Sequence, residues 1–463
     1  MTRGALGLLM VLAGCVRPDA LRTGPSPVPT TFTWVGRDST AAVHNDAWDE
    51  RTWWSQFGVP AVDSLVALGM MANTDLAVAT ARLSDAQASA RIAGAKLLPT
   101  VTGRAEASRA QTVIGNFGAL RLDVLSQATS ASWELDIFGQ LRQERASAVA
   151  GLRASGYDVA DLERTIQGRI VRRAVDAMGV TVRLALADSS VNALRTSAAL
   201  LASRARAGVA SEFDAVRAHT LADDAAATVP SLRAEWSSAI GELAVLCGTD
   251  VARVDALLSG VALPARTLSA PVADAPADVL RRRPDVRAAE LRVVAAAARV
   301  TAAKAALRPS LSLGGTLGVN RTGSRPSAST WSFGPSLSRT LFNRGAKGEL
   351  DARRASVMQR EAEWRGSVLG AARDVETAYA QWRADAVRTQ LLRTVVGERL
   401  TIESLASARW RGGQTDYRDV LDAARQRLDA EQGLVRQRVA ELQAVATIHQ
   451  ALGGGASRGD GVR

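Results

Sequence analysis

Few residues in this chain are spaced for catalytic or metal chemistry. The three histidines, His44, His219 and His449, stand far apart without paired ligands, and the acidic residues show no metal-ligand spacing. We therefore expect no catalytic residue, no metal site and no bound cofactor. The interpretation is a protein that is not an enzyme.

Two carboxylates are nevertheless placed to act together. Asp419 and Asp422 are three residues apart, so in a helix they share one face. Acidic residues in the first turns of a helix also complement the helix dipole and usually face water. Judged from the residues alone, the solvated role is the stronger of the two interpretations.

The first cysteine lies in a targeting signal. Met1-Thr2-Arg3 supplies a positive end, and residues 4–14 form an apolar run with the length of a signal peptide core, too short to span a bilayer. The run ends Leu12-Ala13-Gly14-Cys15, which resembles a bacterial lipobox. We predict a signal peptide over 1–14 and covalent lipid, diacylglycerol and N-acyl, on Cys15. The alternative is an ordinary signal peptide with an incidental cysteine.

The composition favours long helices and excludes some partners. Cys247 is the remaining thiol and is expected to be a small buried hydrophobe. Hydrophobic residues make up 47% of the chain and aromatic residues 4%, which suits closely packed helices rich in Ala, Leu and Val. The net charge of +11 comes from scattered arginines without stacking aromatics, so we expect no nucleic-acid partner. No later window has 18 uninterrupted apolar residues, which predicts no transmembrane helix.

The chain repeats itself about once every 205 to 210 residues. Asn73-Thr74-Asp75-Leu76 with Pro99 recurs as Arg283-Pro284-Asp285-Val286 with Pro309. A second motif, Arg206-Ala207-Gly208 followed by Asp214, recurs as Arg411-Gly412-Gly413 followed by Asp419. Each half is therefore one copy of the same structural unit.

Missing prolines predict two very long helices. Residues 141–207 and 345–411 contain no proline, and each stretch would reach about 100 Å as a helix. Return helices are expected over 211–245 and 416–452, after turns in which Gly208 and Gly413 take the left-handed conformation. Pro230 lies inside the first return helix, where we predict a kink.

Four segments alternate with the period of β-strands, at about 99–111, 120–137, 309–321 and 330–342. Tilted strands of this length cross the hydrocarbon of an outer membrane. Four strands cannot close a barrel, and an open edge cannot stand in lipid, so several chains must share one barrel. Three copies would give twelve strands.

The predicted domain organisation follows from these patterns. A lipidated, extended segment covers 15–60, the first repeat 61–260, a linker 261–283, the second repeat 284–452, and a disordered tail 453–463. The fold class is mainly α with a membrane β-barrel, built from a duplicated unit with four strands and long coiled-coil helices in each chain.

The chain resembles the TolC-like outer-membrane factor family, in its NodT-type lipoprotein branch that serves resistance-nodulation-division pumps. The likeness rests on Trp53-Trp54 with Phe57, Asn73-Thr74-Asp75-Leu76, Trp133 to Gly139, Arg283-Pro284-Asp285, and the two hairpin motifs. The resemblance implies a homotrimer that forms a twelve-stranded barrel and a periplasmic helical barrel. It also implies an outer-membrane location, a periplasmic adaptor, an inner-membrane transporter, and export of small molecules such as drugs, toxic compounds or metals.

The resemblance also assigns roles near the hairpin turns. Asp419 and Asp422 match the gate carboxylates, and threefold symmetry would bring six carboxylates toward one axis. Trp410 and Tyr417 are further gate candidates, because Thr415 stands where some members have a basic residue that holds the closed state. The turns themselves, with Gly208, Asp214, Gly412 and Gly413, are expected to support the fold and contact the adaptor.

Two alternatives share parts of this interpretation. A passive porin or type I protein-secretion duct would have the same barrel and differ in its partner. A soluble periplasmic coiled-coil scaffold would explain the helices but would leave the period-2 segments without a purpose.

Overall fold

The computed structural model describes residues 32–33, 52–113, 119–266, 268, 270–271, 276–323 and 326–454. They divide into two compact units, each described by itself below. The strand unit comprises the described residues of 81–156 and 287–366, and the helical unit those of 27–80, 157–286 and 367–463. The predicted signal peptide, Cys15 and most of the predicted tail lie outside the described residues.

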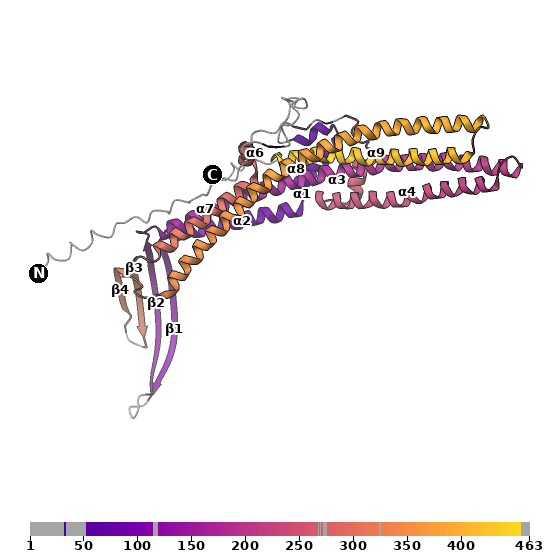
Figure 1. Cartoon of the computed structure of the whole chain (residues 1–463). Helices are drawn as coiled ribbons and strands as arrows, with labels where there is room; N and C mark the ends of the chain where they lie inside the picture. The colour runs from indigo at the N-terminus through magenta and orange to yellow at the C-terminus, as the bar shows by residue number, and fades with distance from the viewer. Residues whose placement is uncertain are drawn as a thin grey trace. The chain divides into compact units, whose positions relative to one another are not determined.

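A four-stranded antiparallel sheet forms the strand unit together with helix ends (Figure 1). The strands hydrogen-bond in chain order: β1 Thr100–Val113, β2 Ala119–Leu135, β3 Ser310–Thr322 and β4 Ala328–Ser338. Each repeat therefore contributes one hairpin, and β2 pairs with β3 across the repeats. The four predicted strands are confirmed.

Two strands end earlier than predicted, and each is followed by a residue that caps the next long helix. β2 stops at Leu135, and the Asp136 carboxylate accepts hydrogen bonds from the backbone amides of Leu141 and Arg142, at 3.0 and 2.9 Å. β4 stops at Ser338 rather than 342. The side chain of Asn343 then accepts a hydrogen bond from the backbone amide of Ala346 at 3.3 Å.

The sheet has one apolar and one hydroxyl-rich face. Register places Leu311 beside both Leu135 and Leu337, and Leu317 beside Trp331, so these side chains share a face. The alternate positions carry small polar residues: Thr102, Ser130, Ser132, Ser310, Ser312, Thr316, Ser332 and Ser336. Leu125 to Leu135 on the apolar face span ten residue steps, about 25 Å when a strand is tilted by about 40°.

The two long helices are α3 Gln140–Arg206 and α8 Arg344–Arg411, with 67 and 68 residues. Both agree with the predicted spans within one residue. Residues of each helix fall in both units. Each hairpin's first strand is preceded by a shorter helix, α2 Thr74–Ala95 or α7 Pro284–Ala305.

In the helical unit, α3 returns as α4 Glu212–Cys247, and α8 returns as α9 Tyr417–Ala451. Figure 1 shows the two hairpins side by side, with both turns at the same end. The smaller elements are η2 Trp53–Phe57, α1 Pro60–Ala72, α5 Val251–Leu258 and α6 Pro276–Arg282. The largest fully buried side chains of the unit include Trp53, Leu65, Ile166, Ile170, Met178, Leu243 and Leu442.

Two predicted segments contain structure that the sequence did not indicate. The predicted extended segment 15–60 ends in η2, where Trp53 stacks on His449 with ring centroids 5.0 Å apart. Burial lowers the pKa of His449 to about 3. The predicted linker 261–283 contains α6. α4 continues through Pro230, so the kink there stays a prediction.

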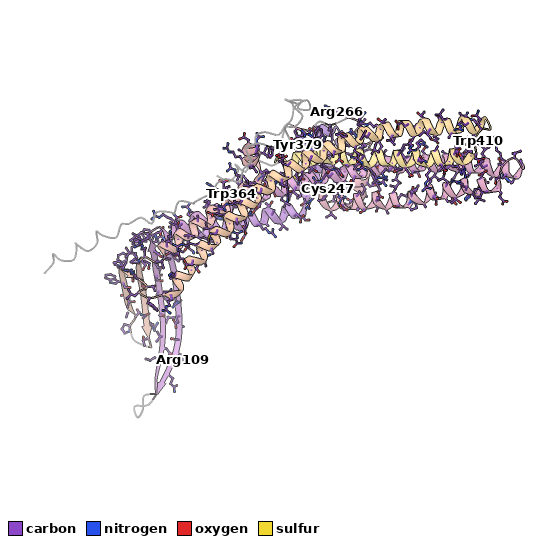
Figure 2. The ribbon with its side chains drawn as sticks, in the orientation of Figure 1. Arg109, Cys247, Arg266, Trp364, Tyr379 and Trp410 are labelled. Carbon is purple, nitrogen blue, oxygen red and sulfur yellow. The ribbon has the colours of Figure 1, made fainter. Side chains whose placement is uncertain are left out.

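Cys247 lies in the core, as predicted (Figure 2). Its Sγ donates to the Leu65 carbonyl at 3.4 Å. Burial raises the pKa of this thiol to about 11. A thiol with so high a pKa forms little thiolate at neutral pH and is chemically inert.

One helical stretch, Pro60–Ala95, is long and apolar enough to cross a membrane by length and composition alone. The sequence prediction required an uninterrupted apolar run, whereas mean hydropathy tolerates polar positions. α1 and α2 divide at Asn73, whose backbone is extended, and α1 buries Val62, Leu65 and Val66 in the core. The α1 half is therefore a core helix.

Asn73 and its equivalent Arg283, which begin the first duplicated motif, hydrogen-bond to the ends of the return helices. Asn73 in the first repeat donates from Nδ2 to the carbonyl of Leu246, near the end of α4, at 2.8 Å. Arg283, its equivalent, donates from Nη1 to the carbonyl of Ala451, at the end of α9, at 2.9 Å. Because the last carbonyls of a helix lack partners within it, both contacts stabilise helix ends.

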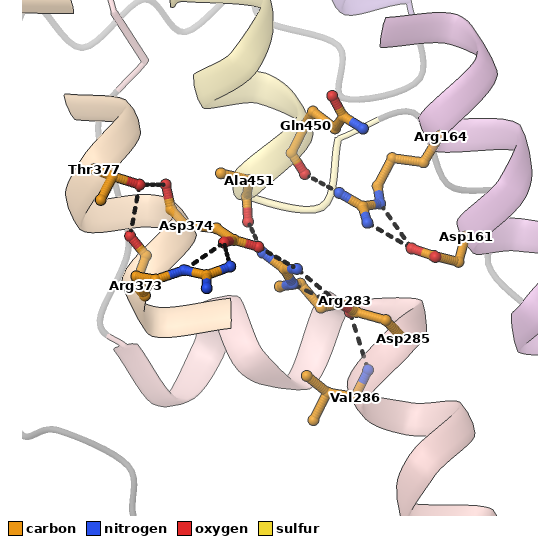
Figure 3. Close-up of polar contacts among 10 residues, drawn as sticks. All are labelled: Asp161, Arg164, Arg283, Asp285, Val286, Arg373, Asp374, Thr377, Gln450 and Ala451. Carbon is orange, nitrogen blue, oxygen red and sulfur yellow. Dashed lines mark hydrogen bonds and ion pairs between the residues drawn. The ribbon is translucent and has the colours of Figure 1, made fainter. Parts of the chain in front are cut away.

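Arg283 is the centre of a buried ion cluster (Figure 3). Its side chain is 4% exposed and binds Asp285 through two hydrogen bonds, at 3.1 and 2.7 Å, and Asp374 at 3.3 Å. Burial by itself raises the pKa of Asp285, but the hydrogen bonds and charge of Arg283, with the charge of Arg164, outweigh it and hold that pKa below its ordinary value. Arg164 also donates to the Gln450 carbonyl, so two arginines hold the end of α9.

Candidate gate at the hairpin turns

The two hairpin turns have the same backbone geometry. Gly208 and Gly413 take φ values of 74° and 69°. The amide of Val209 donates to the carbonyl of Arg204 at 3.0 Å, and that of Gln414 to Arg409 at 2.9 Å. These are Schellman-type helix ends, for which glycine is preferred. The predicted turns are confirmed at Gly208 and Gly413, while Gly412 precedes the left-handed position.

The two candidate gate carboxylates lie on the first turns of α9 and are exposed. Asp419 accepts a hydrogen bond from the hydroxyl of Thr415. Asp422 forms an ion pair with Arg217 of α4, Nη2 to Oδ1, at 3.0 Å. The structure therefore gives the two carboxylates different partners, one neutral and one charged.

Arg217 and Asp422 occupy equivalent positions in the two repeats. Each lies three residues after the duplicated aspartate, Asp214 in the first repeat and Asp419 in the second. The ion pair thus joins the two hairpins at matching points. Asp214 lies in the first turn of α4 and is half-buried.

Trp410 and Tyr417 pack against each other and against apolar residues of both hairpins. Figure 2 shows Trp410 near the hairpin turns. The two aromatic rings meet edge to face with centroids 4.8 Å apart, and Arg204 of α3 lies over the Trp410 ring at 4.8 Å. Tyr417 is buried with Leu201, Ala218 and other small apolar residues of both hairpins. The observed role of both aromatic residues is to join the α8–α9 turn to the α3–α4 turn.

Arg204 and Arg217 are contributors that the sequence reasoning missed. Both come from the first repeat, about 205 residues away from their contacts. The available signal was the opposite charge of Arg217 and Asp422 at equivalent positions. In the part of the chain that the structure describes, no group of three or more His, Cys, Asp or Glu residues is placed to hold a metal ion.

The first turn also presents apolar surface. Val209, Phe213 and Val216 are exposed, with 74%, 70% and 59% of their surface accessible. The second turn has polar or charged residues at its tip, among them Arg411 and Gln414. The two turns share a backbone but offer different surfaces.

Comparison with known proteins identifies close likenesses. A model of the family described as outer membrane efflux protein matches residues 70–249 and 275–454, one range in each repeat. Nodulation protein T of Rhizobium leguminosarum bv. trifolii is 30% identical, over 96% of each chain. The pyoverdine export outer membrane protein OpmQ of Pseudomonas putida is also 30% identical, over 97% of this chain and 96% of its own.

Solved structures agree with these relatives. The outer-membrane channel OprN superposes with a TM-score of 0.86 at 30% identity, covering 95% of this chain and 99% of its own. The Campylobacter jejuni CmeC outer membrane channel has a TM-score of 0.88 at 18% identity, covering 96% and 95%. Because CmeC is only 18% identical, its likeness shows a shared fold alone.

Proposed function

Because the chain belongs to the outer membrane efflux protein family, we propose that three copies form one tunnel whose narrow end is closed at the hairpin turns by Asp419 and Asp422. The protein is an outer-membrane efflux channel of tripartite pumps in Gram-negative bacteria. Cargo is small molecules, the class to which the pyoverdine of one relative belongs.

The sheet supports assembly of several copies. β1 and β4 are edge strands in the single chain, and open edges are excluded from lipid. The apolar face fits the hydrocarbon of the membrane, and the hydroxyl-rich face fits a water-filled lumen. A soluble scaffold would leave this apolar face exposed, and no observation favours a protein-secretion duct.

The Arg217–Asp422 contact carries the gate proposal. Three copies of a duplicated chain make a ring of six equivalent hairpins. In such a ring, equivalent points on neighbouring hairpins are as far from each other as each is from the axis. An arginine and an aspartate whose charged groups are 3.0 Å apart keep their backbone positions within the reach of the two side chains. In such a ring, both positions then lie no farther than that from the axis, where we place the gate.

The gate is tested by single-channel conductance of the purified protein in planar bilayers. Asp419→Ala with Asp422→Ala removes the carboxylates, so conductance should rise or its block by divalent cations should be lost. The matched control is Asp429→Ala, an exposed aspartate farther along α9. Conductance and block that stay at the wild-type values would remove both residues from the gate.

The remaining partners follow from the same assembly. We assign the exposed patch Val209, Phe213 and Val216 to contact with a periplasmic adaptor, which links the channel to an inner-membrane resistance-nodulation-division transporter. Serine at these positions should abolish co-purification of the adaptor, while Val251→Ser, an exposed valine of α5, should not. Co-purification that survives the three serines would exclude the patch.

The lipid anchor is proposed from the sequence motif at Cys15. Mass spectrometry of the mature N-terminal peptide should find Cys15 carrying three acyl chains. An unmodified Cys15, or one still joined to Gly14, would refute the anchor.

A further inference from the structure

The junctions between strand and long helix carry opposite charges in the two repeats. α3 begins at Gln140 and α8 at Arg344, so positions 204 apart, the difference of these two numbers, are equivalent. Residues 134–144 contain three carboxylates and one arginine. Residues 338–348 contain Arg339, Arg344 and Lys347 and no carboxylate. These three cations are called the cationic junction below.

Two of the three carboxylates in the first junction form ion pairs within the chain. Arg142 pairs with Asp136 at 3.0 Å, and Lys96 pairs with Glu144 at 3.1 Å. Members of the cationic junction are exposed, and none forms an ion pair in the described part of the chain. The neighbouring sequence supplies no acidic partner for these cations, because residues 291–348 contain no Asp or Glu.

The cationic junction lies where the apolar face of the sheet ends. Leu337 is the last apolar residue of β4 on that face. Leu341 and Phe342 follow it outside the strand, with 91% and 81% of their surface exposed. Apolar side chains next to exposed cations are typical of the boundary between hydrocarbon and headgroups, where Arg and Lys reach toward phosphate.

The neighbouring copy in the proposed barrel cannot supply the missing anion. Closure places β1 of the next copy beside β4. The segment of β1 and α2 that then lies alongside, 86–105, contains no carboxylate. An anion that neutralises Arg339, Arg344 and Lys347 must come from outside the protein.

We propose that the cationic junction binds the phosphate groups of anionic glycerophospholipids in the periplasmic leaflet of the outer membrane. The helices lie on the periplasmic side, so the strand–helix junctions lie at that leaflet. Leu341 and Phe342 contact the acyl chains, while Arg339, Arg344 and Lys347 bind phosphate oxygens through charge-assisted hydrogen bonds. This inference rests on the proposed trimeric barrel.

The test measures how phospholipid changes the heat resistance of the purified trimer in detergent. Phosphatidylglycerol or phosphatidylcholine is titrated, and the melting temperature of the trimer band is read on a gel. The variant is Arg339→Ser, Arg344→Gln and Lys347→Gln, where the glutamines reproduce Gln140 and Gln143 of the first repeat. The control, Arg353→Gln, Arg354→Gln and Arg360→Gln, removes the same charge from α8 farther along.

Phosphatidylglycerol should raise the wild-type melting temperature more than phosphatidylcholine does. For the junction variant, the phosphatidylglycerol concentration at half effect should rise at least about tenfold, because each cation near a membrane surface contributes about 1 kcal/mol. The control should respond as the wild type does.

Three results would overturn the proposal. Equal responses of the wild type to both lipids would exclude a preference for anionic headgroups. A junction variant that responds like the wild type would exclude these cations. If the variant trimer is weakened without lipid and the wild type ignores phosphatidylglycerol, the anion belongs to a partner subunit. A wild type that forms no trimer would instead refute the proposed assembly, and this inference with it.

Discussion

Arg217 provides a sharp test of the gate at the scale of single residues. Arg217→Asp places like charge beside Asp422, so we expect single-channel conductance to rise. Combining it with Asp422→Arg restores an ion pair in the reverse orientation and should return conductance toward the wild-type value. The pair is partly exposed, and such pairs contribute about 0.2 to 1 kcal/mol. Trimer melting should therefore change little in Arg217→Asp, in Asp422→Arg and in the double variant.

The conductance of the double variant, compared with the conductances of the two single variants, decides this prediction. If the double variant conducts as the sum of the two single changes, the ion pair does not hold the gate. Arg233→Asp, an exposed arginine farther along α4, is the matched charge reversal and should leave conductance unchanged.

The Arg283 cluster acts at the scale of elements, because it joins α7, α8 and the end of α9. Arg283→Met leaves Asp285 and Asp374 without their shared cation and the Ala451 carbonyl without its donor. The side chains of Asp285 and Asp374 are 28% and 38% exposed, so the loss should be smaller than the roughly 3 to 5 kcal/mol of a fully buried pair, and the melting temperature should still fall. Arg281→Met, an exposed neighbour on α6, is the control. Equal melting of the two variants would contradict a stabilising role for the cluster.

The same cluster predicts a pH dependence. Arg283 holds the pKa of Asp285 below its ordinary value. A carboxyl group with a depressed pKa in the folded state contributes stability that is present above the unfolded pKa of about 3.9 and is lost as pH falls through the folded value. Melting curves of the wild type should therefore lose stability below about pH 4, and Asp285→Asn should reduce that loss.

Element-scale features differ in how far the sequence could predict them. The long helices could be predicted within one residue, because missing prolines and the turn glycines Gly208 and Gly413 are local signals. The end of β2 could not, since Asp136 directly after it caps α3 through two backbone amides, and the alternating pattern ran past the end of β4 at Ser338. Contacts between hairpins, such as that of Arg217 with Asp422, depend on how each helix is rotated about its own axis. No local sequence pattern indicates that rotation.

At the scale of the whole molecule, the duplication predicts how the barrel closes. Within the chain, Ala128 of β2 lies opposite Gly318 of β3. Pro309 and Pro99 are 210 apart, so Gly318 corresponds to Ser108 of β1, and Gly314 corresponds to Arg104. Ala128 lies opposite Arg104 and Gly334 of β4 lies opposite Gly314, so Ala128 corresponds to Gly334. Gly334 of one copy should therefore lie opposite Ser108 of the next copy.

Cysteines at both positions test this register. Gly334→Cys with Ser108→Cys should form disulfides between copies and give a covalent three-chain product under mild oxidation. Gly334→Cys with Thr102→Cys is six residues out of register and should not. Cys247 will not interfere, because it is buried and its pKa is about 11. Cross-linking of the out-of-register pair alone would refute the predicted closure.

The Arg217–Asp422 pair also bears on how this chain arose. A tunnel of six identical hairpins would bring identical residues together at this position, arginine against arginine or aspartate against aspartate. Opposite charges can meet there only when two halves of one polypeptide mutate independently. The contact is therefore younger than the gene duplication, and it distinguishes the two halves of the chain.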